Sequence, residues 1–176
     1  MRSFVVTTTI ALGLTFSNAA FVNAADIVTC GYSIEPVGAA LAAETKLVDV
    51  KYSKKQKKEI RAAYAKFPSY EAPYAPRKMA AGDRYQRTVA GEDGVAMMFD
   101  HMRVIVSPRD YADPSQGTTV TLPNGVTARW YAAGQAAGAE ERLAFPVDDR
   151  FVTISSPDRT LSRMQMEGIA ATVAKL

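Results

Sequence analysis

The chain has 176 residues, of which 48% are hydrophobic and 22% are charged, and its formal net charge is +3. These proportions are typical of one globular domain, and they exclude a disordered chain and a collagen-like repeat. A single cysteine and a single histidine exclude an internal disulfide, a cysteine-based zinc site and a multi-histidine metal centre.

Residues 1–25 have the pattern of a secretory signal peptide. Arg2 supplies a positive charge, residues 4–14 form a short apolar run, and small residues surround Ala24 and Ala25, where a signal peptidase would cut. The run is too short to span a bilayer comfortably, although an uncleaved anchor or a buried N-terminal helix stays open as the alternative. We therefore expect an exported protein, secreted or located in the cell envelope, with no transmembrane helix in the mature chain.

Cys30 follows the expected signal peptide closely and raises the question of lipidation. Bacterial lipoproteins are acylated on a cysteine that follows a leucine and two small residues. Here Asp26 and Thr29 precede Cys30, and neither fits that pattern. We expect a free thiol, with a lipid anchor on Cys30 as the minority interpretation. Residues 26–52 then form an N-terminal extension, in which residues 39–50 are compatible with a helix.

The first clear element of the mature chain is a helix of about fifteen residues over 53–67. Ser53 and Gln56 have the spacing of a capping box. Apolar side chains then recur at helical spacing, at Ile60, Ala63, Tyr64 and Phe67. Pro68 ends the pattern, and the prolines of residues 68–82 favour an extended connection.

After Gly82 the pattern changes to short strands joined by tight turns. We expect strands over 84–90, 95–99, 102–107, 118–122, 126–131, 143–147 and 151–155. Asn124-Gly125 predicts a type I′ hairpin turn with positive φ at both residues. Apolar residues alternate on one face from Val120 to Trp130, which predicts a sheet covered on one side. Sequential tight turns predict antiparallel pairing.

The chain is expected to end with a second amphipathic helix. Ser162 with Gln165 has capping-box spacing, and Leu161 with Met166 has the spacing of a hydrophobic staple. The apolar stripe of this helix consists of Met166, Ile169, Ala170 and Val173. The methionines expected in the core are Met97, Met98, Met102, Met164 and Met166.

Together these elements predict an α+β fold. We expect an antiparallel meander sheet of about six to seven strands, with an N-terminal and a C-terminal amphipathic helix packed on it. This single domain would extend over residues 53–176.

The residues that could carry catalysis form no complete set. His101 has a neighbouring carboxylate, but consecutive strand residues point to opposite faces, so we expect His101 on the surface. Asp148 and Asp149 are typical of a turn between strands. Asp110 and Asp113 lack the glutamate that completes a calcium loop. We therefore predict no catalytic residue, no metal site and no cofactor.

One charge feature suggests a binding function. Between Lys51 and Lys66 the chain has seven basic residues and one acidic residue, Glu59, for a local net charge of +6. The basic residues expected on the exposed helix face are Lys54, Lys55, Lys57, Lys58 and Arg61. They predict weak binding to anionic envelope polymer or phospholipid headgroups, with a solvated helix face as the alternative. We expect no nucleic-acid partner for an exported protein.

Several segments resemble a known family. They are Phe67-Pro68, Pro73-Tyr74-Ala75-Pro76, the VTLPNGVTARW hairpin at 120–130, LAFPVDDRFVTISS at 143–156 and LSRMQMEGIA at 161–170. Their order is similar to the small uncharacterised extracytoplasmic domain found at the C-terminus of bacterial lipoproteins, anti-sigma factors and sporulation-associated proteins. The resemblance implies an exported, non-enzymatic binding or sensory module of the bacterial cell envelope. That family has no agreed catalytic residues, so none is transferred to this chain.

Two other classes stay open. A secreted inhibitor or protein-partner-binding protein would present an ordered, protruding loop at 108–117 or 132–141. A hydrolase with an unusual site would gather His101 with a serine and a carboxylate in a cleft. An exposed apolar groove would instead favour the binding module.

Overall fold

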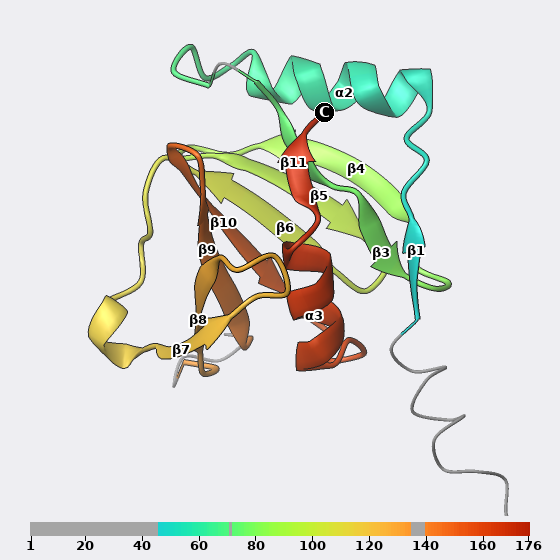
Figure 1. Cartoon of the computed structure of the whole chain (residues 1–176). Helices are drawn as coiled ribbons and strands as arrows, with labels where there is room; N and C mark the ends of the chain where they lie inside the picture. The colour runs from blue at the N-terminus through green and yellow to red at the C-terminus, as the bar shows by residue number, and fades with distance from the viewer. Residues whose placement is uncertain (1–45, 71, 135–139) are drawn as a thin grey trace, which may run out of the picture. The chain divides into compact units, whose positions relative to one another are not determined.

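The computed structural model describes residues 46–70, 72–134 and 140–176 (Figure 1). The expected signal peptide, Cys30 and most of the N-terminal extension lie outside these ranges, so export and lipidation stay predictions. The described part contains the helices α2 (Lys54–Tyr64) and α3 (Arg163–Ala170) and one 3₁₀ turn, η1 (Pro114–Gln116). Its strands are β1 (Leu47–Asp49), β2 (Tyr74–Pro76), β3 (Lys78–Ala80), β4 (Tyr85–Ala90), β5 (Val95–Phe99), β6 (Arg103–Ser107), β7 (Thr118–Thr121), β8 (Thr127–Tyr131), β9 (Arg142–Val147), β10 (Arg150–Ser155) and β11 (Val173–Lys175).

The main sheet has seven strands in the order β4-β5-β6-β10-β9-β8-β7, and every pair is antiparallel. The predicted α+β class is confirmed, because both helices pack on this sheet. Neighbours follow chain order within β4–β6 and within β7–β10, but β6 pairs with β10 rather than with β7. The sheet is therefore two meanders joined at β6 and β10. The segment 108–117 must cross the width of β10, β9 and β8 to reach β7.

One face of the main sheet is covered. α2 packs on β4 and β5, while α3 packs on β9 and β10 and on the small pair β1–β3. The largest side chains buried between these layers are Phe145, Ile60, Met97, Met102, Leu122, Leu143, Ile154, Ile169, Val95, Val104, Val106 and Val152. A second small pair, β2–β11, also lies on this side (Figure 1). We call the opposite side of the main sheet the uncovered face.

The capping box predicted for α2 is present. Ser53 Oγ accepts from the Gln56 backbone N–H at 3.2 Å, and Gln56 Oε1 accepts from the Ser53 N–H at 2.8 Å. The helix ends at Tyr64, earlier than expected, and a turn follows it. The residues Ile60, Ala63 and Tyr64 are buried as predicted, so the stripe does face the core.

The C-terminal helix is confirmed, but its expected length is wrong. Ser162 and Gln165 form a capping box, and both staple residues, Leu161 and Met166, are buried. α3 ends at Ala170, so Val173 is not on the helix. Val173 lies instead in β11, opposite Pro76 of β2. This pairing gives the chain end backbone hydrogen bonds that a longer helix would have supplied internally.

The start of the fold differs from the expected helix over 39–50. Residues 47–49, the end of that range, form β1, which pairs with β3. Leu47 packs against the core. The extension therefore contributes a strand, because the edge of β3 offers backbone hydrogen-bond partners. The spacing of apolar residues in the sequence does not indicate this pairing.

The β7–β8 hairpin is present, but its turn is not type I′. Gly125 has φ +84°, whereas Asn124 does not have positive φ. The Gly125 N–H donates to the Leu122 carbonyl at 2.8 Å, which places Pro123 at the first central position of the turn. The proline ring fixes φ near −65° at Pro123, which is incompatible with type I′, and only Gly125, the last residue of the turn, adopts the left-handed conformation.

The methionines divide into three groups. Met97, Met102 and Met166 are buried as expected. Met98 is half-buried on the uncovered face, because β5 alternates between the two sides. Met164 is 67% exposed, so its assignment to the core is wrong. It lies on α3 outside the stripe that the helix buries.

Candidate functional site

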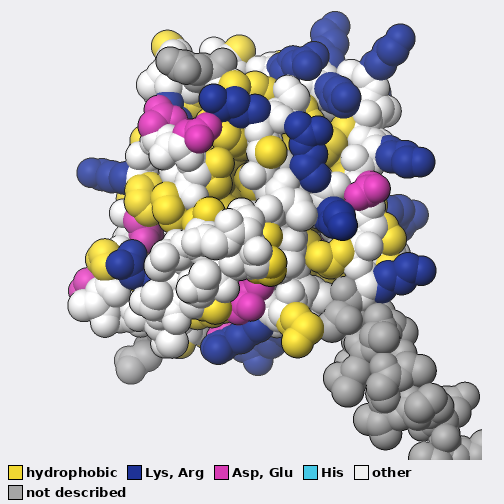
Figure 2. Space-filling view, viewed as in Figure 1, with side chains coloured by type: hydrophobic (Ala, Val, Ile, Leu, Met, Phe, Trp, Pro, Cys, Tyr) yellow, Lys and Arg dark blue, Asp and Glu magenta, His cyan; other side chains and the backbone are white. Residues whose placement is uncertain are grey.

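The five basic residues predicted as a binding surface all lie on α2, and all are exposed: Lys54, Lys55, Lys57, Lys58 and Arg61. We call them the α2 basic face. Among the described residues no carboxylate lies within ion-pair distance of them. Glu59 instead accepts from the Tyr85 hydroxyl at 3.1 Å and from the Thr88 N–H at 2.7 Å. Figure 2 shows Lys and Arg side chains at the upper right of the view, where α2 lies, with further ones down the right-hand side.

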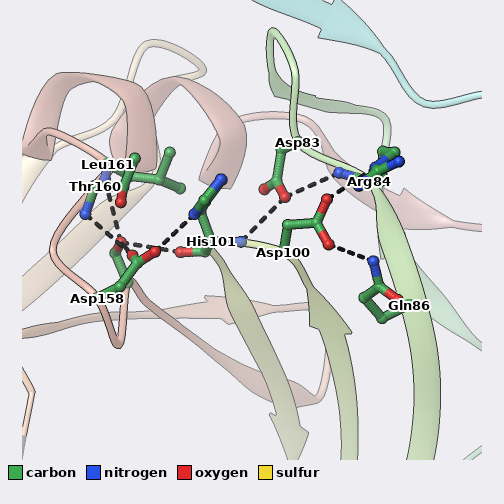
Figure 3. Close-up of polar contacts among 9 residues, drawn as sticks. Asp83, Arg84, Gln86, Asp100, His101, Asp158, Thr160 and Leu161 are labelled. Carbon is green, nitrogen blue, oxygen red and sulfur yellow. Dashed lines mark hydrogen bonds and ion pairs between the residues drawn. The ribbon is translucent and has the colours of Figure 1, made fainter.

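A polar cluster joins the β5–β6 turn to the loop between β10 and α3 (Figure 3). His101 Nδ1 lies 2.6 Å from Asp158 Oδ2, and the two side chains are 42% and 45% exposed. The hydrogen bond to Asp158 raises the pKa of His101, and the same bond holds the pKa of Asp158 far below its usual range. His101 is thus on the surface, as predicted.

Ser156 brings a serine to this cluster without the geometry of a catalytic triad. Its Oγ lies 2.9 Å from the His101 backbone oxygen and 3.1 Å from Asp158 Oδ1, and it accepts from the Leu161 N–H at 3.1 Å. A serine nucleophile needs its hydroxyl on the imidazole ring, so that the ring can take the proton. Here the hydroxyl contacts the histidine main chain. The contacts therefore join two loops.

Asp83 lies beside the cluster and is 2% exposed. Its Oδ1 accepts from the backbone N–H groups of Arg84 at 2.9 Å and His101 at 3.1 Å. Burial raises the pKa of Asp83. By accepting from these two backbone N–H groups, the Asp83 carboxylate links the start of β4 to the β5–β6 turn. Within the described ranges there is no group of three or more His, Cys, Asp and Glu side chains that could hold a metal ion.

The uncovered face carries a row of polar side chains that runs across four strands. Ser155 of β10 is opposite Arg103 of β6 on one side and Arg142 of β9 on the other. Arg142 is in turn opposite Tyr131 of β8. Residues opposite one another in paired strands point to the same side of a sheet. We call these four residues the arginine row.

A pocket of about 570 Å³ lies over three of these residues, Arg103, Ser155 and Arg142. This volume is within the range of roughly 300–1,000 Å³ that is typical of small-molecule sites. Its other lining residues are Gly91, Asp93, Gly94, Ala96, Ile105, Ser107, Asp110, Tyr111, Ala112, Glu140 and Thr153. We call it the row pocket. It is partly an apolar groove, since Ala96 and Ile105 face it from neighbouring strands.

The walls of the row pocket are held by specific contacts. Glu140 accepts from the Arg103 guanidinium and, at 2.9 Å, from Ser155 Oγ. The Tyr131 hydroxyl donates to Asp110 Oδ2 at 3.0 Å, and the Arg142 guanidinium lies over the Tyr131 ring at 5.5 Å. Burial, together with the hydrogen bond to Asp110, raises the pKa of Tyr131. The Asp110 contact holds the crossing segment against the sheet.

The row pocket was not predicted. Arg103 and Arg142 carry no motif, and they become neighbours only through the pairing of β10 with β6 and β9. The sequence around Asp110 suggests only an incomplete calcium loop. The segment 108–117 is anchored to the sheet at Asp110 through Tyr131, while its residues 113–116 are exposed, and 132–141 lies partly outside the described residues.

Comparison with known proteins finds no matching family model, no matching curated protein and no matching solved structure. The resemblance to the extracytoplasmic domain therefore stays a prediction from the motifs. In the portion of the chain that the structure describes, no helix has both the length and the apolar character needed to cross a membrane.

Proposed function

We propose that this chain is an exported, non-enzymatic binding or sensory module of the bacterial cell envelope, and that the α2 basic face binds anionic polymer or phospholipid. The observation that best supports this proposal is the distribution of charged and buried side chains on α2. Five cations project from one short helix without an ion-pair partner among the described residues, while the opposite side of the helix is buried. The packed side fixes the orientation of the charged side.

The expected affinity is weak and sensitive to salt. Each basic residue near an anionic surface contributes about 1 kcal/mol, and the attraction falls off within a Debye length, about 8 Å at physiological ionic strength. The five basic side chains are exposed, so they can approach an anionic surface to within this distance. Binding should therefore be measurable at low salt and mostly lost near physiological salt.

The test is co-sedimentation of the mature protein with vesicles of phosphatidylglycerol and phosphatidylcholine. Replacement of Lys54, Lys55, Lys57 and Lys58 by glutamine should abolish binding at low salt. The thermal unfolding midpoint should stay unchanged, because these side chains are exposed.

A matched control removes the same charge elsewhere. The control replaces four exposed basic residues outside α2, namely Lys46, Lys78, Arg109 and Arg159, by glutamine. This variant should retain most of the binding. Equal loss in both variants would show that net charge rather than α2 matters, and equal binding by the α2 variant and the unchanged protein would reject the proposal.

A further inference from the structure

We propose that the row pocket binds a small ligand with a carboxylate head and an apolar body, and that the ligand carboxylate takes the place of Glu140 on Arg103. This goes beyond the proposed function and is independent of it. The row pocket opens on the uncovered face, whereas α2 packs on the other side of the main sheet. Either surface can therefore fail its test alone.

The arginine row places one arginine on either side of Ser155, and the Arg142 guanidinium now lies over the Tyr131 ring. Neighbouring strands are about 4.8 Å apart, so the backbones of Arg103 and Arg142 are separated by roughly 10 Å. Side chains of this length can converge on one oxyanion between them, and the planar guanidinium suits a carboxylate. Arg142 has no ion-pair partner among the described residues. Glu140 balances only one of the two charges.

Glu140 already shows which chemistry this end of the row pocket accepts. It is a carboxylate, its side chain is 15% exposed, and it contacts both Arg103 and Ser155. The pairing is incomplete, because one oxygen, Oε1, serves both donors. The Nε of Arg103 is buried and has no acceptor among the described residues. A guanidinium pairs best with a carboxylate when two N–H groups meet two oxygens.

A ligand carboxylate is free to adopt the orientation that Glu140 lacks. It can accept from Arg103 through both oxygens while it also faces Arg142. Because the Nε is enclosed in the present arrangement, this pairing requires Glu140 to leave. Ligand and Glu140 therefore compete for one position.

The remainder of the row pocket favours an apolar, uncharged body. Ala96 and Ile105 lie on the sheet side next to the row, and Ala112 lines the pocket from the crossing segment. Two acids, Asp93 and Asp110, line it as well. A second anionic group near them would be repelled. The ligand thus carries its negative charge at the arginine end only.

The probe is decanoate, compared by isothermal titration calorimetry with decanol and with decyl phosphate. Decanoate should bind the mature protein, and decanol should bind about tenfold more weakly, as expected for the loss of a charge-assisted hydrogen bond. Arg142→Gln should weaken decanoate binding by about the same factor. Glu140→Gln should strengthen it, because a neutral amide competes less well for Arg103.

Two further variants keep the outcome decisive. Arg129→Gln, on the uncovered face but outside the pocket lining, should leave decanoate binding unchanged. Ala96→Phe should abolish it by filling the space for the apolar body, with no change in charge. The thermal unfolding midpoint of each variant shows whether it is folded.

Several results would overturn the inference. Equal binding of decanol and decanoate would show that the carboxylate is not recognised. Weaker binding by Glu140→Gln would show that Glu140 assists rather than competes. Binding of decyl phosphate without decanoate would reject the carboxylate head, and binding that survives Ala96→Phe would place the ligand elsewhere.

Discussion

Truncation of one side chain of α3 tests how the C-terminal helix is held. Ile169 is fully buried and belongs to the core cluster between the helix and the sheet. α3 packs against β1, β3, β9 and β10, which come from both ends of the described chain. Ile169→Ala removes apolar contacts from this junction without adding a polar group.

The magnitude follows from the atoms removed. Three carbons at about 0.8 kcal/mol each give a transfer cost of about 2.4 kcal/mol. If about 80 Å³ stays empty, the cavity adds up to about 2 kcal/mol at about 24 cal/mol per Å³. The expected loss is therefore about 2–4 kcal/mol. This loss is a large share of the free energy of unfolding of a typical domain, which is about 5–15 kcal/mol.

Urea denaturation followed by tryptophan fluorescence measures this loss directly. Trp130 Nε1 donates to Glu167 Oε1 on α3 at 2.7 Å, so the indole reports on helix docking. Met164→Ala is the matched control, because Met164 lies on the same helix and is 67% exposed. We expect the control to stay within about 0.5 kcal/mol of the unchanged protein. The same urea midpoint for Ile169→Ala and the control would refute the packing of α3.

Two further perturbations test the sheet and the polar cluster. Gly94→Ala should strongly destabilise the pairing of β5 with β6, because the new Cβ would lie 2.2 Å from the Val106 carbonyl oxygen. Gly91→Ala, with its nearest contact at 3.6 Å, should be tolerated, and equal unfolding midpoints would contradict the observed register. For His101→Gln, the raised pKa of His101 and the lowered pKa of Asp158 set the pH range. The pair stabilises fully between the unfolded-state pKa values, about 4 and about 6.5, and this is lost as pH rises through the folded pKa of His101. Urea midpoints of the variant and the unchanged protein should therefore converge once the pH exceeds the raised pKa of His101, and a gap that does not vary with pH would contradict the ion pair.

Elements set by near neighbours could be predicted from the sequence. The capping boxes of α2 and α3 join residues three positions apart, and the strand alternation depends on the next residue but one. The three-residue strands β1, β2, β3 and β11 are too short to show a period. Each forms because a partner strand distant in the sequence is available, as in the pairing of β11 with β2, where Val173 lies opposite Pro76. No local pattern contains that information.

The two candidate surfaces differ in the same way. The α2 basic face lies on one helix, so a single periodic segment is enough to place it. The arginine row requires the pairing of β6 with β10, and turn chemistry fixes only strands that a short turn connects. Ser155 brings Arg103 and Arg142 together only in that strand order. From the sequence these arginines are ordinary polar positions of two strands.

The strand order also explains why a pocket exists on the uncovered face. Once β6 pairs with β10, the chain must cross three strands to reach β7, and the helices with their small strand pairs already occupy the other side. The crossing segment therefore lies over the uncovered face, where Tyr131 holds it through Asp110. This contact helps to explain why Tyr131 is only 4% exposed on a face that no helix covers. The position of the row pocket thus follows from topology, and its two arginines set the charge of the ligand that it would admit.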